Sequence, residues 1–131
     1  MAVHQMEHEL SGMDEKIAHG AGLSALWASW ARYVYENNVS RFAQYAVNVW
    51  NIEMDFEHPE KTALAGIKAT EDYFKSLNMP TSLRELNVDP ASFEELAEKC
   101  TNTAQEHWQV LRYWTSRILL KFIRWHIKKQ Q

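Results

Sequence analysis

The chain has 131 residues, of which 46% are hydrophobic and 24% charged, and its formal net charge is −3. These values fit a single soluble globular domain and are not those of a disordered acidic or basic tail. The single cysteine, Cys100, excludes an internal disulfide framework and fits a reducing, cytoplasmic location. No apolar run approaches the roughly 20 residues that a membrane span needs.

The N-terminal segment carries two histidines at helical spacing. His4 and His8 are four residues apart, so on a helix both imidazoles leave the same face. A third histidine, His19, follows a short distance later, and imidazole is a good ligand for zinc, iron, nickel and copper. Surface pairs at this spacing are also common, so spacing alone leaves a metal site open. Gly20, directly after His19, would let backbone or substrate approach closely.

Two helices are predicted in the next part of the chain. Apolar residues recur at helical spacing from Leu23 to Val34, and Asn37–Asn38 is expected to end that helix. Ser40 is expected to cap the following helix. The apolar face of this second helix would consist of Phe42, Tyr45, Ala46, Val49 and Trp50. The tryptophans expected in the core or in a pocket wall are Trp27, Trp30 and Trp50.

The helical pattern continues after residue 58. Pro59 suits the first turn of a helix that residues 78–80 end. Its expected inward side chains are Leu64, Ile67, Phe74 and Leu77. Ser82 with Glu85 resembles a capping box that starts a short turn of helix, and Asp89-Pro90 signals the start of a last helix. The expected core residues of that last helix are Phe93 and Leu96. No stretch shows sustained strand alternation, so the body is predicted to be all-α.

The charges divide the chain near residue 103. Residues 104–131 carry six basic residues and one acidic residue, whereas residues 1–103 carry eight basic and sixteen acidic residues. We therefore separate a helical domain at 1–103 from a basic, Trp-rich tail at 104–131. The tail has apolar residues at helical spacing. It could be a solvated helix with one apolar face, or it could bind an anionic membrane surface, a partner or nucleic acid.

Two strings near the N-terminus carry a family resemblance. The segment from His4 to Met13 (HQMEHELSGM), followed by His19 to Leu23 (HGAGL), resembles the iron-containing alcohol dehydrogenases, and most of all their butanol dehydrogenase branch. The likeness runs in order to about residue 102. Its further segments are residues 30–35, 41–50, 66–67, 74–77, 79–83 and 94–97. It implies the helical, bundle-like C-terminal domain of the iron-containing alcohol dehydrogenase and dehydroquinate synthase-like fold.

The resemblance also implies an activity and a site. In that family an Asp and three His hold one divalent metal, usually Fe²⁺ and sometimes Zn²⁺, which polarises the alcohol oxygen while hydride passes to NAD or NADP. By resemblance His4 and His19 are metal ligands, and His8 is a non-ligand histidine of the catalytic pocket. The implied substrate is a small, butanol-like primary alcohol or its aldehyde, and the full-length parent is expected to be a homo-oligomer. Glu7 and Glu9 are expected to be solvated or to contact the ligands.

The sequence departs from the family pattern in three places. The N-terminal domain, which would carry the nucleotide-binding glycines and the other two ligands, is missing. The truncated chain is therefore expected to be inactive alone, and no cofactor-binding residue is assigned. The spacing from His8 to His19 is slightly longer than the commonest pattern. The tail after about Thr103 does not look like the family's end, and we hypothesise that a shift of reading frame produced it.

Two alternatives of other classes stay open. The chain could be a helical partner module that complements a separate cofactor-domain subunit. It could also be a non-catalytic helical protein that binds a membrane or nucleic acid through residues 104–131. The alcohol dehydrogenase interpretation requires no membrane or nucleic-acid partner.

Overall fold

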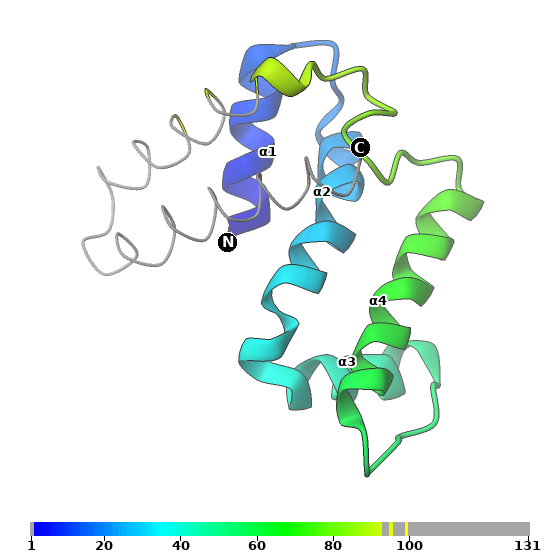
Figure 1. Ribbon diagram of the computed structural model, residues 1–131. Coiled ribbons are helices and arrows are strands. Elements are labelled where there is room, and N and C mark those ends of the chain that lie inside the picture. Colours follow the sequence, from blue (N-terminus) through cyan, green and yellow to red (C-terminus); the bar gives the residue numbers. More distant parts are fainter. Residues whose placement is uncertain (1, 93–94, 96–98, 100–131) are drawn as a thin grey trace.

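The computed structural model describes residues 2–92 together with residues 95 and 99. This part of the chain is helical and contains no strand, which confirms the all-α prediction (Figure 1). Its elements in chain order are α1 (Ala2–Met13), α2 (His19–Val34), η1 (Tyr35–Asn38), α3 (Val39–Trp50), α4 (Pro59–Ser76) and η2 (Pro90–Ser92). The predicted tail at 104–131 lies outside the described residues.

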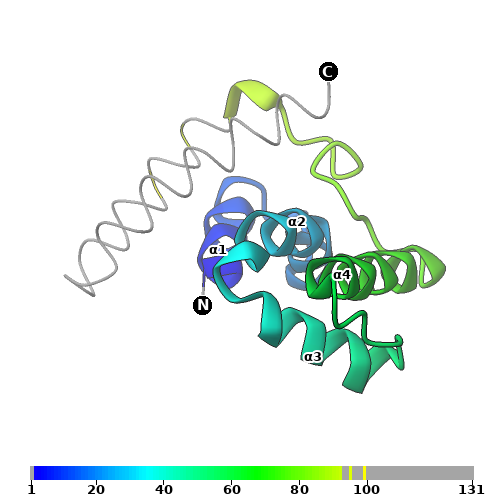
Figure 2. The same ribbon diagram turned by 60° about the horizontal axis from the view of Figure 1, so that its bottom comes forward.

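Helix α2 is the central element of the described chain. Helix α1 packs against it near its beginning, and α4 packs alongside it. Helix α3 lies at the end of α2 that is remote from α1, and it packs most extensively on α4 (Figures 1 and 2). None of the helices within the described residues combines the length and the apolar character that crossing a bilayer requires.

Two apolar clusters hold these helices together. The first joins α1 to α2 and to the segment after α4, and its buried residues are Val3, Met6, Leu10, Ile17, Ala25, Leu26 and Leu83. The second joins α2 to α4, and its buried residues are Ala28, Ala31 and Ile67. Fully burying a large aliphatic side chain contributes about 1.5–3 kcal/mol. The first cluster holds most of these large side chains, and so it fixes α1, with its histidines, beside the start of α2.

Helices α3 and α4 instead approach each other through small residues. A Cβ on Gly66 would lie 2.5 Å from the Cβ of Ala46 and 2.8 Å from its Cα, so this approach requires glycine. The residues that α4 buries are Thr62, Ala63, Gly66, Ile67 and Thr70. Leu64 and Leu77 are 37% and 51% exposed, so the prediction that they face inward is wrong. Val49, predicted on the apolar face of α3, is 58% exposed. The close contact places small residues, rather than these larger ones, between the two helices.

Most of the predicted helix boundaries are confirmed. Helix α2 contains residues 23–34 and begins earlier, at His19. The break predicted at Asn37–Asn38 falls at the end of η1. Pro59 begins α4, where its missing N–H costs no hydrogen bond. Asn78, with a left-handed φ of 55°, follows the end of that helix, as the predicted stop requires.

The predicted cap of α3 is wrong by two residues. Helix α3 begins at Val39, and its N-cap is Asn38, whose side chain accepts a hydrogen bond from the backbone N–H of Arg41 at 3.3 Å. Ser40 lies inside the helix, and its hydroxyl donates to the same Asn38 oxygen at 3.0 Å. Asn and Ser are comparable caps, and here Asn38 has the non-helical backbone, with φ −156°, that a cap needs.

The segment after α4 forms turns rather than the predicted turn of helix. Ser82 Oγ donates to Glu85 Oε1 at 2.9 Å, so the two residues of the expected capping box do pair. Asn87 then adopts a left-handed φ of 56°, which stops a helix from propagating. Asp89-Pro90 does begin a helical turn, η2. The expected core residues Phe93 and Leu96 lie outside the described part of the chain.

Candidate metal centre

Three histidines meet where α1 packs against the start of α2. His4 and His8 belong to α1, and His19 is the first residue of α2. The ring centroids are 5.6 Å apart for His4 and His19, and 5.5 Å apart for His8 and His19. Because both rings lie beside His19, this confirms that His4 and His8 share one face of a helix. His4 is half-buried, whereas His8 and His19 are exposed and open to further groups.

The spacing of these imidazoles allows two of them to bind one metal ion. A ring nitrogen binds zinc at about 2.0–2.1 Å, so two imidazoles on one ion have centroids at most roughly 6.5 Å apart. His4 and His8 both meet this limit with His19. Within residues 2–92, 95 and 99, no group of three or more His, Cys, Asp or Glu side chains is arranged to hold a metal. Among the described residues, the spacing thus allows pairs of imidazoles, His4 with His19 or His8 with His19, to share an ion.

A buried carboxylate, Glu7, lies against His19. Its side chain is 0% exposed, and its Oε1 accepts a hydrogen bond from the hydroxyl of Ser11. Its Oε2 forms an ion-pair contact with Nδ1 of His19. Apart from this contact, buried Oε2 has no hydrogen-bond partner among the described residues. The expectation that Glu7 is solvated is therefore wrong, and the alternative, contact with a presumed ligand, is what the structure shows.

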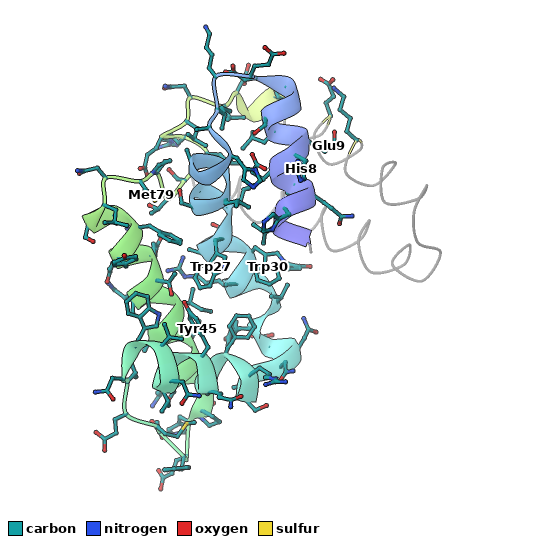
Figure 3. The ribbon with its side chains drawn as sticks, turned by 180° about the vertical axis from the view of Figure 1, so that it is seen from behind. His8, Glu9, Trp27, Trp30, Tyr45 and Met79 are labelled. Atoms are coloured by element: carbon teal, nitrogen blue, oxygen red, sulfur yellow. The ribbon has the colours of Figure 1, made fainter. Side chains whose placement is uncertain are left out.

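Glu7 could have been found from its spacing. It lies three residues after His4 and four before Ser11, which places all three on one helix face. The sequence does not reveal that α2 then covers this face and buries the carboxylate. Glu9, the other acidic residue of this segment, is half-buried on α1 (Figure 3).

The packing of Glu7 requires a glycine on α2. A Cβ on Gly22 would lie 2.8 Å from Cγ and 3.2 Å from Oε1 of Glu7, closer than side chains normally approach. Gly20, next to His19, is in a different situation. A Cβ there would meet only an ordinary contact, 3.8 Å from Cε of Met79. The packing of Glu7 therefore requires a glycine at position 22. Gly20 instead lines the cavity described next.

A largely apolar cavity of about 550 Å³ opens beside His4. Its wall includes the side chains of Leu23, Trp27, Trp30, Phe74 and Met79. Figure 3 shows Trp27 and Trp30 next to each other on α2. Met79 lies near the end of α4, on the Trp27 side of the picture. The prediction that these two tryptophans form core or pocket wall is confirmed. The volume is that of a pocket for a small organic molecule.

Ser24 holds the part of the cavity wall that comes from the segment after α4. Its hydroxyl donates to the carbonyl oxygen of Pro80 at 2.7 Å, and the carbonyl oxygen of Ala21 lies 3.0 Å away. Ser24 is buried, so water does not compete for this bond. The bond ties the segment after α4 to α2, and so it holds Met79 over Gly20 at the cavity wall.

The sequence places this arrangement in a known family. Residues 1–115 match the Fe-containing alcohol dehydrogenase family, C-terminal. The chain belongs to this family. NADH-dependent butanol dehydrogenase A of Clostridium acetobutylicum is 35% identical over 102 residues, which are 77% of this chain and 26% of the relative. NADH-dependent butanol dehydrogenase B of the same organism is 37% identical over 100 residues, which are 75% of this chain and 25% of the relative.

The fold agrees with membership of the iron-containing alcohol dehydrogenase family. NADH-dependent butanol dehydrogenase A from Thermotoga maritima matches this structure with a TM-score of 0.78 and 26% identity, over 93% of this chain and 32% of that chain. This confirms the predicted C-terminal helical domain. The chain spans about a quarter of the length of the two Clostridium relatives.

The structure brings together every site residue that the sequence predicted. The rings of His4 and His8 each lie beside the ring of His19. Their individual roles remain predictions, because imidazole spacing alone does not separate a metal ligand from its neighbour.

Proposed function

We propose that this chain supplies the helical half of the metal site of an NAD(P)-dependent alcohol dehydrogenase, which interconverts a primary alcohol and its aldehyde. In this proposal His4 and His19 are ligands of Fe²⁺, with Zn²⁺ as the alternative, and His8 faces the substrate and the nicotinamide. The observation that carries the proposal is the convergence of these three histidines beside an apolar cavity in a chain of this family.

The residues present fit a divalent metal. Neutral imidazoles suit iron and zinc, and the rings of His4 and His19 are close enough to share one ion. The family resemblance favours His4 over His8 as the ligand, and His4 is also the histidine that lines the cavity. A bound metal would act as a Lewis acid that polarises the alcohol or carbonyl oxygen.

The cavity favours a small apolar substrate. Trp27, Phe74 and Leu23 present apolar surface to it, so they exclude water and orient an alkyl chain rather than a sugar or a charged group. Because His4 lies at the wall of the same cavity, the hydroxyl end of such a substrate would point towards the histidines. A butanol-like alcohol meets both conditions.

The 131-residue chain alone is expected to be inactive. In this proposal it offers two of the family's four ligands, His4 and His19, and its sequence contains no glycine-rich turn for a dinucleotide phosphate. We therefore propose that activity requires the remaining ligands and the nucleotide site from outside this sequence.

Titration of the purified chain with Zn²⁺ tests the ligand assignment. His4→Gln and His19→Gln should each weaken Zn²⁺ binding by more than the about 10–100-fold that losing an outer partner of a ligand costs, and His8→Gln should weaken it less. His58→Gln is the matched control, because His58 is an exposed histidine just before α4. Equal Zn²⁺ affinity in the wild type, His4→Gln and His19→Gln would overturn the assignment.

A chimaera tests the activity. We would join this chain to the portion of the Thermotoga maritima enzyme that it does not match, and follow butanol-dependent formation of NADH and NADPH. The chimaera should be active, its His19→Gln variant inactive, and its His58→Gln variant unchanged. A soluble, metal-loaded chimaera without activity would refute the proposed function. Activity of the isolated chain would refute its expected inactivity.

A further inference from the structure

We propose that Glu7 is a positioning residue that fixes the tautomer and the orientation of the His19 imidazole. In this arrangement Nδ1 of His19 carries the proton and faces Oε2 of Glu7, so Nε2 keeps its lone pair for a metal. The part of the inference that concerns metal affinity rests on the function proposed above, in which His19 is a ligand.

The two side chains differ sharply in exposure. The side chain of Glu7 is fully buried, whereas that of His19 is 52% exposed. One edge of the His19 ring is therefore held against the carboxylate, while the ring also lies next to His4 and His8. Because Nδ1 of this half-exposed imidazole is held against Glu7, its other nitrogen, Nε2, is suited to face away from the carboxylate.

Packing alone does not explain a carboxylate at this position. A buried carboxylate is unfavourable unless it is paired and hydrogen-bonded, and an apolar side chain of similar shape avoids that cost. Among the described residues, the partners of Glu7 are the hydroxyl of Ser11 on Oε1 and the imidazole of His19 on Oε2. Oε2 is buried without a hydrogen-bond partner in the described part of the chain, and Nδ1 of His19 is the group that lies against it, so we assign the proton of His19 to Nδ1 as the donor that this oxygen lacks.

The rest of the local structure keeps Glu7 in place. Gly22 leaves the space that the side chain occupies, since a Cβ there would lie 2.8 Å from Cγ of Glu7. Ser11 holds the other carboxylate oxygen, and its hydroxyl also lies 3.3 Å from the carbonyl oxygen of Ile17, close to the start of α2. Gly22 and Ser11 thus hold the carboxylate in place independently of its contact with His19.

The chemical consequence is a better ligand. An imidazole that donates one N–H to a carboxylate is more basic at its other nitrogen and is held in one orientation. Removing such a partner from a metal-binding histidine typically weakens metal affinity by about 10–100-fold. We expect a loss in this range when Glu7 is replaced.

The decisive experiment reads the tautomer directly, without any metal. Long-range ¹H–¹⁵N NMR of the ¹⁵N-labelled chain at about pH 8, where imidazoles are neutral, distinguishes a proton on Nδ1 from one on Nε2. We expect His19 to be protonated on Nδ1 in the wild type and to lose this preference in Glu7→Met. Ser11→Ala should retain it, and His58 serves as an internal reference. A wild-type His19 protonated on Nε2 overturns the proposal, whether or not any variant folds.

Zn²⁺ affinity and thermal stability then separate positioning from packing. Glu7→Met should bind Zn²⁺ about 10–100-fold more weakly while its Tm stays equal or rises, because a buried charge is gone. Glu7→Gln keeps the shape of the side chain and one acceptor oxygen, so its Zn²⁺ affinity should lie between those of Glu7→Met and the wild type. A loss of Zn²⁺ affinity that merely follows a loss of Tm would mean a structural role and would overturn the proposal.

The results also distinguish this proposal from the proposed function. If His19 is protonated on Nδ1 in a Glu7-dependent way but the wild type does not bind Zn²⁺, positioning by Glu7 stands and the metal assignment fails. If Zn²⁺ binds through His4 and His19 while the tautomer of His19 is the same with and without Glu7, the metal assignment stands and the positioning role fails.

Discussion

At the α3–α4 end of the domain the polar side chains pair with one another, whereas at the α1–α2 end they surround an open group of imidazoles. Near α3 and α4, Nε1 of Trp50 donates to Oγ1 of Thr70 at 2.9 Å, and the hydroxyl of Tyr45 lies 2.6 Å from the same oxygen. Near α1 and α2, Glu7 is buried against a half-exposed His19. The first arrangement forms its hydrogen bonds among the described residues, whereas in the second Oε2 of Glu7 has no hydrogen-bond partner there.

The difference separates residues that stabilise the fold from residues that build a site. Natural sequences break the rules of packing and polar satisfaction mainly where function requires it. A buried carboxylate beside exposed imidazoles is such a break, and the small-residue contact of α3 with α4 is not. Substitutions at the α3–α4 end should therefore change stability alone, and substitutions behind His19 should change metal binding more than stability.

The largest loss of stability is expected from Gly66→Ala. Its new Cβ would meet Cβ and backbone Cα of Ala46 at 2.5 and 2.8 Å, so the two helices must move apart. We expect a loss of about 2–3 kcal/mol in urea unfolding, with unchanged Zn²⁺ affinity of the folded chain. Gly12→Ala on α1 is the control, because nothing lies within 4 Å of its Cβ and it should gain about 0.5–1 kcal/mol. A stable Gly66→Ala variant would contradict the close contact.

A smaller loss of stability, with a larger effect on the site, is expected from Gly22→Ala. Its Cβ would press on the Cγ of Glu7, which can shift more easily than a backbone atom. We expect a loss of about 1 kcal/mol. The displaced carboxylate should also weaken Zn²⁺ binding, measured by titration beside Gly12→Ala. Wild-type Zn²⁺ affinity in Gly22→Ala would show that the position of Glu7 does not matter to the histidines.

Local spacing was sufficient for most of the helices and for the pair of His4 and His8 on α1. The periodicity of residues 23–34, the proline at residue 59 and the interval between His4 and His8 are properties of short segments, and each predicted its feature correctly. His19 required more than spacing, since it lies on another helix, and the family resemblance supplied it.

Tertiary contacts decided what spacing could not. Leu64 has the right interval for a buried position, yet it is 37% exposed because α3 approaches α4 at Gly66 and Ala46 instead. Glutamate is usually a surface residue, yet Glu7 is buried because α2 covers that face of α1. Hydrophobic periodicity shows that a helix has an inner face, but the shape of the partner helix determines which residues that face contains.

The smallest effect is expected on the outer face of α4, where Lys68 and Asp72 form an exposed ion pair. The hydrogen bond from Lys68 holds the pKa of Asp72 below its ordinary value of 3.8. Because the pKa is lowered in the folded state, the pair stabilises the fold above the ordinary carboxyl pKa. This contribution is lost as the pH falls through the lowered pKa.

Asp72→Asn should therefore lower the urea midpoint slightly at about pH 7, and this difference should shrink as the pH falls through the lowered pKa of Asp72. The effect at neutral pH should shrink in high salt, because both side chains are more than half exposed and salt screens such pairs. Zn²⁺ affinity should not change, since the pair is no part of the histidine group. A difference that persists at low pH or in high salt would mean that Asp72 acts through packing or helix propensity, and that the outer face of α4 contributes more to the fold than its exposure indicates.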